Sequence, residues 1–203
     1  MIATTPKPAQ PLVLSARLGL VSVPEVPDGL PREALFDVAE ARERIRALGL
    51  ALGLSLLARR EAGFPEAAAP TEGAALDEAL RRTLEGVDVV WMQGDEVVAA
   101  FVVEVRPGSY EGLRRLADTL ALFPKLKAPL YAVTAPALES GLLAEVHRPV
   151  YRLLKKPLTE LLRLLDWERL KSEVDQLGER VRYLKPEFLE GISDPVEAPH
   201  SEG

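Results

Sequence analysis

The sequence of 203 residues has no cysteine, only two histidines and no long apolar run. Without cysteine, the chain can form no disulfide framework, no zinc–thiolate or iron–sulfur site and no cysteine nucleophile. Two isolated histidines do not supply the ligands of a histidine-based zinc site. The longest nearly apolar run, residues 47–58, is shorter than the roughly 20 residues that a membrane span needs. No signal-peptide pattern opens the chain, so we expect a cytoplasmic protein without a membrane segment.

Asparagine is also absent, and arginine outnumbers lysine by 18 to 7. Few thermolabile residues together with 17 prolines are typical of a protein from a thermophile. Codon bias in a GC-rich genome would produce the same composition, so the two explanations stay open. Neither explanation bears on function.

The charge is acidic overall but unevenly distributed. The net charge is −6 at pH 7, which argues against a generally basic nucleic-acid binder. Residues 106–156, however, hold nine basic and four acidic residues, whereas residues 25–105 and 157–203 carry net charges of −8 and −5. A basic segment within an acidic chain is what a phosphate-facing surface requires, although segment charges also fluctuate by chance. The segment 106–156 is therefore the candidate contact surface for DNA.

The chain divides into three segments by composition. Residues 1–31 hold six of the 17 prolines and form a predicted N-terminal arm; residues 32–190 form a predicted α/β domain and residues 191–203 a flexible tail. Hydrophobic spacing predicts helices over 31–52, 77–84, 110–122, 137–146 and 158–184. It predicts strands over 12–23, 54–59, 87–92, 97–105, 129–134 and 150–154. This order favours one α/β domain with a mixed central sheet flanked by helices.

Two neighbouring strands at the centre are predicted to form an antiparallel hairpin. A short turn at residues 93–96 separates them. The second strand, residues 97–105, is apolar on both faces apart from Glu104, which is typical of a strand in the middle of a covered sheet. The hairpin is expected to bring Asp88, at the start of the first strand, close to the end of the second strand, where Glu104 stands.

This acid pair is the one constellation in the sequence with chemical meaning. Asp88 and Glu104 could hold a divalent cation such as Mg²⁺, which activates water and neutralises a phosphodiester transition state. Arg106 follows Glu104 on the same strand face, where it could hold the phosphate. A structural alternative stays open, in which Asp88 only flanks a turn and Glu104 pairs with Arg106 or Arg115. The sequence has no phosphate-binding glycine loop, dinucleotide fingerprint or nucleophile elbow.

Several segments fall in the order and spacing of a known family. They are Gly86-Val87-Asp88-Val89-Val90-Trp91, Ala99-Ala100-Phe101-Val102-Val103-Glu104 and Tyr110-Glu111-Gly112-Leu113-Arg114-Arg115-Leu116-Ala117-Asp118. Over residues 40–194 the chain resembles a prokaryotic group within the restriction-endonuclease-like, or PD-(D/E)xK, nuclease superfamily. The resemblance implies a restriction-endonuclease-like domain over 32–190 and metal-dependent cleavage of DNA. It also implies a site made of Asp88, Glu104 and Arg106, with Asp88 and Glu104 as ligands of Mg²⁺.

One position departs from the pattern of that family. The family has two acids in E-x-E on the second strand, and the corresponding positions here are Val102 and Glu104. With the first acid missing, few negative ligands offset the dehydration of Mg²⁺, so its binding is expected to be weak or absent. Either Glu104 and Arg106 take the places of the acid and the lysine of (D/E)-x-K, two residues along the strand, or the catalytic activity is lost. We expect a catalytically impaired or degenerate nuclease that retains nucleic-acid binding, and the alternative is a non-enzymatic protein-interaction module on a nuclease fold.

The candidate contacts to nucleic acid are Arg106, Arg114 and Arg115. Arg115 lies four residues after Glu111, and Arg114 lies four residues before Asp118. The charges on this helix face could therefore neutralise one another instead of contacting phosphate. The last predicted helix carries a coiled-coil-like apolar stripe of Leu170, Val174, Leu177, Val181 and Leu184. Two heptads are compatible with a homodimer seam, but packing of the stripe within its own domain is the favoured interpretation.

Overall fold

The computed structural model describes residues 12–15, 19–22, 34–57 and 78–196, so most of the predicted N-terminal arm lies outside the described residues. The chain divides into two compact units, Met1–Leu30 and Pro31–Gly203. In the first unit, β1 (Leu12–Ser15) and β2 (Gly19–Ser22) pair as an antiparallel ribbon, in the segment where the sequence predicts strands. Within the described part of the chain, none of the helices has the length and apolar composition of a membrane span.

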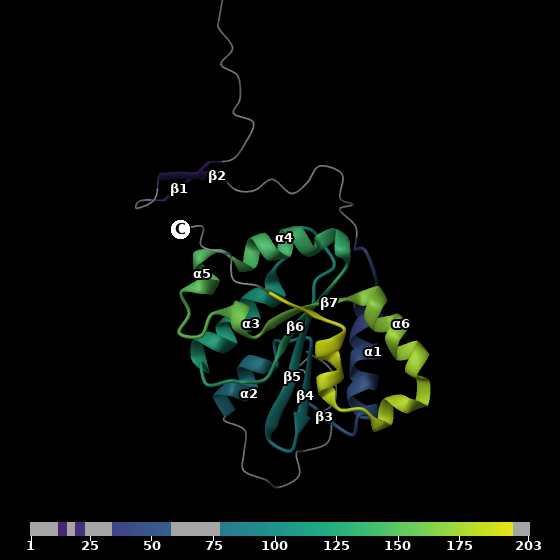
Figure 1. The fold of residues 1–203 in the computed structure, drawn as a ribbon. Helices are drawn as coiled ribbons and strands as arrows, with labels where there is room; N and C mark the ends of the chain where they lie inside the picture. Colours follow the sequence, from purple (N-terminus) through teal and green to yellow (C-terminus); the bar gives the residue numbers. More distant parts are fainter. Residues whose placement is uncertain (1–11, 16–18, 23–33, 58–77, 197–203) are drawn as a thin grey trace, which may run out of the picture. The chain divides into compact units, whose positions relative to one another are not determined.

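The second unit is built on one six-stranded mixed sheet (Figure 1). Its strands lie side by side in sequence order; they are β3 (Ser55–Leu56), β4 (Val89–Gln93), β5 (Glu96–Val103), β6 (Leu130–Thr134), β7 (Leu162–Asp166) and β8 (Asp194–Pro195). β3, β4 and β5 pair antiparallel, β5, β6 and β7 pair parallel, and β8 is antiparallel to β7. The predicted α/β class with a mixed central sheet is thereby confirmed.

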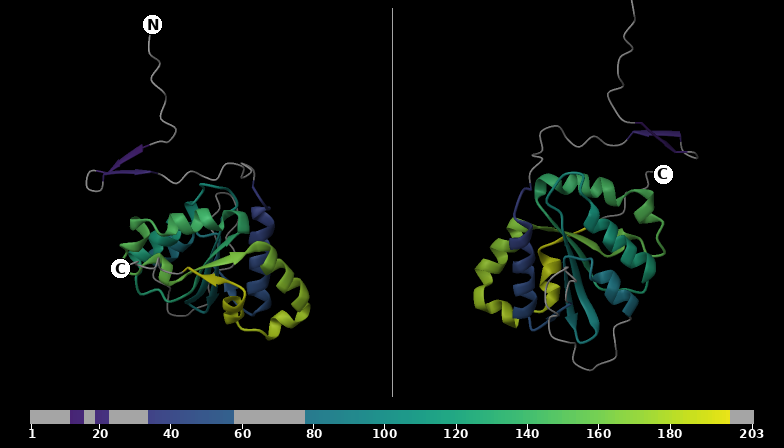
Figure 2. Two further views of the ribbon diagram at one scale, coloured as in Figure 1. Left: turned by 45° about the horizontal axis from the view of Figure 1, so that its top comes forward. Right: turned by 180° about the vertical axis from the view of Figure 1, so that it is seen from behind.

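Helices cover both faces of this sheet (Figure 2). One face is covered by α2 (Glu78–Leu84), α3 (Glu111–Leu122), α4 (Pro136–Val146), α5 (Pro149–Arg152) and a 3₁₀ turn at Leu158–Glu160. The other face is covered by α1 (Val38–Ala51), α6 (Trp167–Leu177) and 3₁₀ segments at Gly178–Tyr183 and Pro186–Gly191. Side chains of β5 alternate between the two apolar cores, with Val102 in the first and Phe101 in the second.

β4 and β5 form the predicted central hairpin. Val89 pairs with Phe101, and a bulge interrupts the register after Trp91. The turn contains Gly94 with a φ of +59°, a backbone conformation that favours glycine. As a result, Asp88 stands just before β4 and beside the last residues of β5.

α1 approaches β4 so closely that a side chain at Gly49 would not fit. A Cβ atom there would lie 2.5 Å from Nε1 of Trp91. The same indole nitrogen donates a 3.0 Å hydrogen bond to the carbonyl oxygen of Ile45. The helix begins after Asp37, whose carboxylate accepts a 2.7 Å hydrogen bond from the N–H of Ala39. These contacts fix α1 over the sheet.

The predicted strand over residues 150–154 is wrong, because this segment is helical. α5 begins at Pro149, whose fixed φ suits the first turn of a helix. Tyr151 is the inward-facing residue of the turn and is 2% exposed. A single turn of helix with one buried residue has too few positions for its 3.6-residue period to be recognised in sequence.

The single helix predicted over residues 158–184 is wrong in its first part. β7 lies there between β6 and β8, and α6 begins only at Trp167. The side chains of Leu162 and Leu164 enter one core and that of Leu165 enters the other. A strand buried on both faces has no polar–apolar alternation, so its leucines could be read as part of a helix.

The C-terminal end also differs from the prediction. The sequence predicts a flexible tail from residue 191, but residues 194–195 form β8 and Val196 is 4% exposed within the first core. Residues 197–203 lie outside the described residues. Of the predicted apolar stripe, Leu170 of α6 and Val181 of the following 3₁₀ segment are buried in the second core. The homodimer stays a prediction.

Candidate functional site

Asp88 ties the end of the central hairpin to α1. Its Oδ2 accepts a 2.8 Å hydrogen bond from the backbone N–H of Val103, the last residue of β5. Its Oδ1 accepts a 2.5 Å hydrogen bond from Nη2 of Arg42 on α1, and its side chain is 6% exposed. The carboxylate therefore stands where a strand carbonyl would be if the ladder between β4 and β5 continued. Asp88 does more than flank a turn.

Arg42 is a site residue that sequence reasoning missed. It lies on the polar side of α1, and its side chain is 32% exposed. Among the described residues its Nε is buried without a hydrogen-bond partner, while Nη2 is bound to Asp88. The pair joins residues 46 positions apart. No local pattern in the sequence distinguishes Arg42 from Arg46, one turn later on the same helix.

Glu104 faces the opposite helical layer. Its Oε1 accepts hydrogen bonds of 2.9 Å from the N–H of Gly112 and 3.3 Å from the N–H of Leu113, in the first turn of α3. These N–H groups have no partner inside the helix, and the residue at the cap position, Tyr110, supplies no side-chain hydrogen bond. Glu104 therefore caps α3 from the neighbouring strand, and a negative charge there is favoured by the helix dipole.

Burial dominates the protonation behaviour of Glu104, which is 4% exposed. Burial raises the pKa of its carboxyl group from 4.5 to about 7, although the N–H groups of Leu113 and Gly112 lower it. The nearby charge of Asp88 raises this pKa further, and the charge of Arg114 lowers it. The two predicted acids are therefore close enough for their charges to interact, as the hairpin prediction requires.

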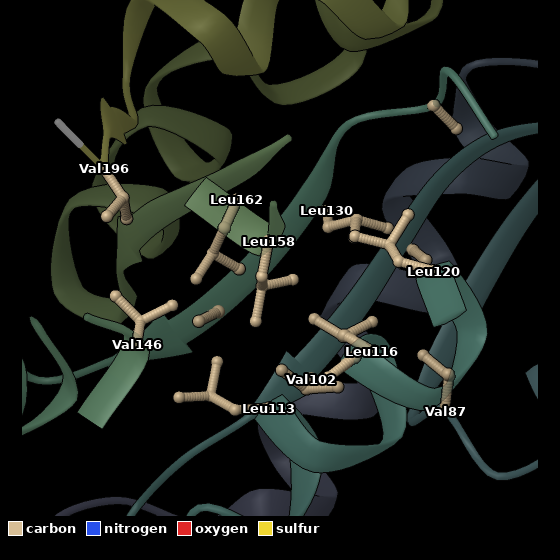
Figure 3. Close-up of a cluster of buried hydrophobic side chains, with 14 of the residues drawn as sticks. Val87, Val102, Leu113, Leu116, Leu120, Leu130, Val146, Leu158, Leu162 and Val196 are labelled. Carbon is tan, nitrogen blue, oxygen red and sulfur yellow. The ribbon is translucent and has the colours of Figure 1, made fainter. Parts of the chain in front are cut away.

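Val102, at the position where the resemblance predicts an acid, is fully buried. It lies in the first apolar core beside Leu113 and Leu116 of α3, where Figure 3 shows all three side chains. A Cβ atom at Gly112 would lie 2.6 Å from Cβ of Val102 and 2.8 Å from Oε1 of Glu104. The first turn of α3 is thus pressed against Val102 of β5 and against Glu104, which follows the end of β5.

Both carboxylates that the resemblance offers to Mg²⁺ already have hydrogen-bond partners within the protein. The ion prefers octahedral oxygen coordination, with carboxylates that can turn towards it. Here Asp88 is bound to Arg42 and Glu104 to the first turn of α3, so each carboxylate is held by a different helical layer. Val102 adds no oxygen. Within the described ranges, no three His, Asp or Glu side chains form a group suited to a metal ion.

The predicted basic residues fall into two groups. Arg106 and Arg114 are exposed to solvent, and Arg114 is near enough to lower the pKa of Glu104. Arg115 instead donates a 2.7 Å hydrogen bond to the carbonyl oxygen of Gly86 and forms an ion pair with Glu111. Glu104 pairs with neither Arg106 nor Arg115, because its partners are backbone N–H groups.

A hollow in the second unit lies away from these residues. It has a volume of about 630 Å³ and lies between α2, the turn of the hairpin and the segment that follows α3. Its lining includes Leu80, Glu96 and Leu126, and none of the predicted site residues contributes to it. The concave surface and the acid pair are therefore separate features.

The comparisons with known proteins identify the family of the chain. Residues 67–196, more than half of the sequence, match the family model of the C-terminal domain of the type II restriction enzyme NmeDI. This segment includes the hairpin, Glu104, α3 and the strands up to β8. The search of curated proteins and the search of solved structures each give no match. The chain therefore belongs to the family of the type II restriction enzyme NmeDI C-terminal domain, which bears out its predicted relation to restriction endonucleases.

Proposed function

We propose that the chain is a nuclease-related domain that contacts nucleic acid but has lost independent cleavage. The observation that carries this proposal is the packing of α3 on β5. Val102 is buried at the position of an acid, and Glu104 caps the helix. A carboxylate committed to a helix terminus does not turn towards an ion without uncapping that helix.

The proposal assigns the PD-(D/E)xK positions to Asp88, Val102 and Glu104. In this assignment Mg²⁺ binding is weak or absent, since the two remaining carboxylates hold α1 and α3 in place of an ion. Loss of one acid alone would weaken a metal site. The domain is proposed to cleave no longer because one acid is missing and because the carboxylates of Asp88 and Glu104 are bound to Arg42 and to α3.

Contact with nucleic acid rests on the exposed cations near the acid pair. Arg106 and Arg114 are exposed, and they belong to the basic segment 106–156. Positive side chains there would face phosphates, whose contacts provide affinity without reading sequence. Arg115 is left out of this contact because it holds Gly86 and Glu111.

The test combines cleavage and binding on the full chain. We expect no cleavage of plasmid or single-stranded DNA with Mg²⁺ or Mn²⁺, and binding of a DNA duplex that weakens with salt by about 0.9 log units per log unit of salt for each phosphate contacted. Arg106→Ala with Arg114→Ala should lower both the affinity and the salt slope. Arg182→Ala is the matched control, because Arg182 is exposed on the other helical layer.

Two results would overturn the proposal. The first is cleavage that is abolished by Asp88→Asn, a variant that keeps an oxygen acceptor for Val103. The second is the absence of DNA binding at low salt, or binding that ignores salt. The first result would identify a working nuclease site at Asp88, and the second would leave the protein-interaction module as the better account.

A further inference from the structure

The surface around α5 combines exposed apolar side chains with positive charge. Val150 is 63% exposed and Leu153 is 84% exposed, although both are large apolar residues. Arg152 and Lys155 are exposed beside them, and α5 lies next to α4 at the edge of the helical layer (Figure 1). We call these four residues and Arg148, which is 63% exposed at its side chain, the α5 patch.

The α5 patch has no negative charge within its own segment. Residues 146–159 contain two arginines, two lysines and a histidine but no aspartate or glutamate. The preceding acid, Glu145, is mostly buried, and its carboxylate accepts hydrogen bonds from Arg148 and from the hydroxyl of Tyr151. The charge of Glu145 is therefore offset by Arg148, and Arg152 and Lys155 keep the patch positive.

The backbone of the α5 patch is anchored on both sides. Tyr151 is 2% exposed, and its hydroxyl donates a 3.1 Å hydrogen bond to Glu145 on α4. On the far side, Nζ of Lys156 donates a 2.9 Å hydrogen bond to the carbonyl oxygen of Leu126, and Leu158 is fully buried. A surface held in this way loses little conformational entropy when a ligand binds.

We propose that the α5 patch binds an acidic peptide segment of a protein partner that also carries a large apolar side chain. Carboxylates of the peptide complement Arg152 and Lys155, and the apolar side chain covers Val150 and Leu153. Apolar centres with a charged rim and enrichment in arginine are typical of protein interfaces. This inference goes beyond the proposed function and holds whether or not the chain contacts nucleic acid.

Other occupants fit the α5 patch less well. A second copy bound face to face would place arginine and lysine against their own copies. A nucleic-acid backbone would use the cations but not the two apolar side chains. A lipid surface needs a longer apolar helix face than a turn of four residues provides.

The experiment selects ligands from a displayed library of random peptides with the full chain as bait. Counter-selection uses two variants of the α5 patch, Val150→Ser with Leu153→Ser, and Arg152→Glu with Lys155→Glu. Leu122→Ser with Lys125→Glu is the matched control, since Leu122 is an exposed leucine of α3 and Lys125 is an exposed lysine outside the patch. All substituted residues are exposed, so the variants are expected to fold. Circular dichroism checks that they do.

The expected peptides carry more acidic than basic residues and at least one Leu, Ile, Met, Phe or Trp. Their affinity should fall at least about tenfold on each α5 variant and stay unchanged on the control. The inference would be overturned if the selected peptides lack acidic residues. It would also be overturned if the selection yields no peptide whose binding requires the α5 patch. The inference would also be overturned if the serine variant loses binding to a DNA duplex or to vesicles of phosphatidylserine in phosphatidylcholine. The occupant of the α5 patch would then be nucleic acid or lipid.

Discussion

At the scale of single residues, Glu104 has a structural role that its sequence position does not reveal. The sequence marks it as the only charge in an apolar strand, which makes it a candidate ligand. The structure gives that carboxylate two N–H donors from α3. A lone acid at the end of a strand can bind a metal ion or cap a helix. The outcome depends on how close the first turn of the next helix lies to the acid in the folded protein, and the number of residues between them does not determine that distance.

Glu104 should make stability depend on pH. Its pKa is about 7 in the folded protein and 4.5 otherwise, so the folded state holds the proton more tightly. The stabilising contribution of this group is complete below pH 4.5 and is lost as the pH rises through about 7; it is on the order of 3 kcal/mol. Glu104→Gln should flatten this dependence, and at pH 8 it should be as stable as the wild type or more stable.

The measurement is urea unfolding of both proteins at pH 5 and pH 8. Glu111→Gln serves as control, because Glu111 lies in the first turn of α3, the helix that Glu104 caps, with its side chain 67% exposed. A large loss of stability in Glu104→Gln at pH 8 would contradict the account. Such a loss would mean that the negative charge at the terminus of α3 outweighs its burial.

Gly112 is expected to tolerate no larger residue. A Cβ atom there would lie 2.6 Å from Val102, inside the first core. Gly112→Ala should lower the free energy of unfolding by about 1–3 kcal/mol, because both β5 and α3 must shift. Gly191→Ala is the control, since a Cβ at Gly191 meets nothing within 4 Å. Equal stability of the two variants in thermal unfolding would show that α3 does not press on β5.

At the scale of elements, Asp88 connects α1 to the end of β5. Asp88→Ala would leave the N–H of Val103 and the guanidinium of Arg42 without this acceptor. Removing a buried acceptor costs about 1–3 kcal/mol, and Asp88→Asn should cost less because one oxygen remains. Chemical denaturation compares the two variants with the wild type. If Asp88→Ala unfolds at the same urea concentration as the wild type, Asp88 is not a structural tie.

Elements with one polar face were predictable, and strands buried on both faces were predictable only where β-branched residues fill them. α3 has a clear apolar stripe with Leu113, Leu116 and Leu120 buried, and the sequence predicts it within a residue of its bounds. β5 is predictable because β-branched valines and Phe101, which favour strands, fill most of its two faces. β7 is equally buried but rich in leucine, a strong helix former, so its sequence favours helix.

The candidate site was predictable in its carboxylates but not in their partners. Asp88 and Glu104 stand out because charges are rare in buried strands. Their partners are a guanidinium from α1 and two backbone N–H groups of α3, which come from different layers of the fold. The sequence does not show which backbone N–H group will bond to which side chain. The structural role of both acids is therefore visible only in the folded protein.

At the scale of the whole molecule, the family match relates the domain to restriction endonucleases, and the structure gives this domain one mixed six-stranded sheet. Residues 67–196 match the C-terminal domain of the type II restriction enzyme NmeDI, and they include five of the six strands of the sheet. In this domain the two acids at the end of the central hairpin join the sheet to α1 and α3. The central claim of our account is that these acids hold the helical layers together and do not hold a metal ion.

The free energy of unfolding, measured with and without millimolar Mn²⁺, tests this claim most directly. An ion that binds only the folded state stabilises it by mass action, without any need for catalysis. The account predicts the same unfolding free energy in both conditions for the wild type, and a loss of stability in Asp88→Ala that Mn²⁺ leaves unchanged. A gain in stability with Mn²⁺ in the wild type that disappears in Asp88→Ala and Glu104→Gln would contradict it, because the two carboxylates would then be ligands of the ion.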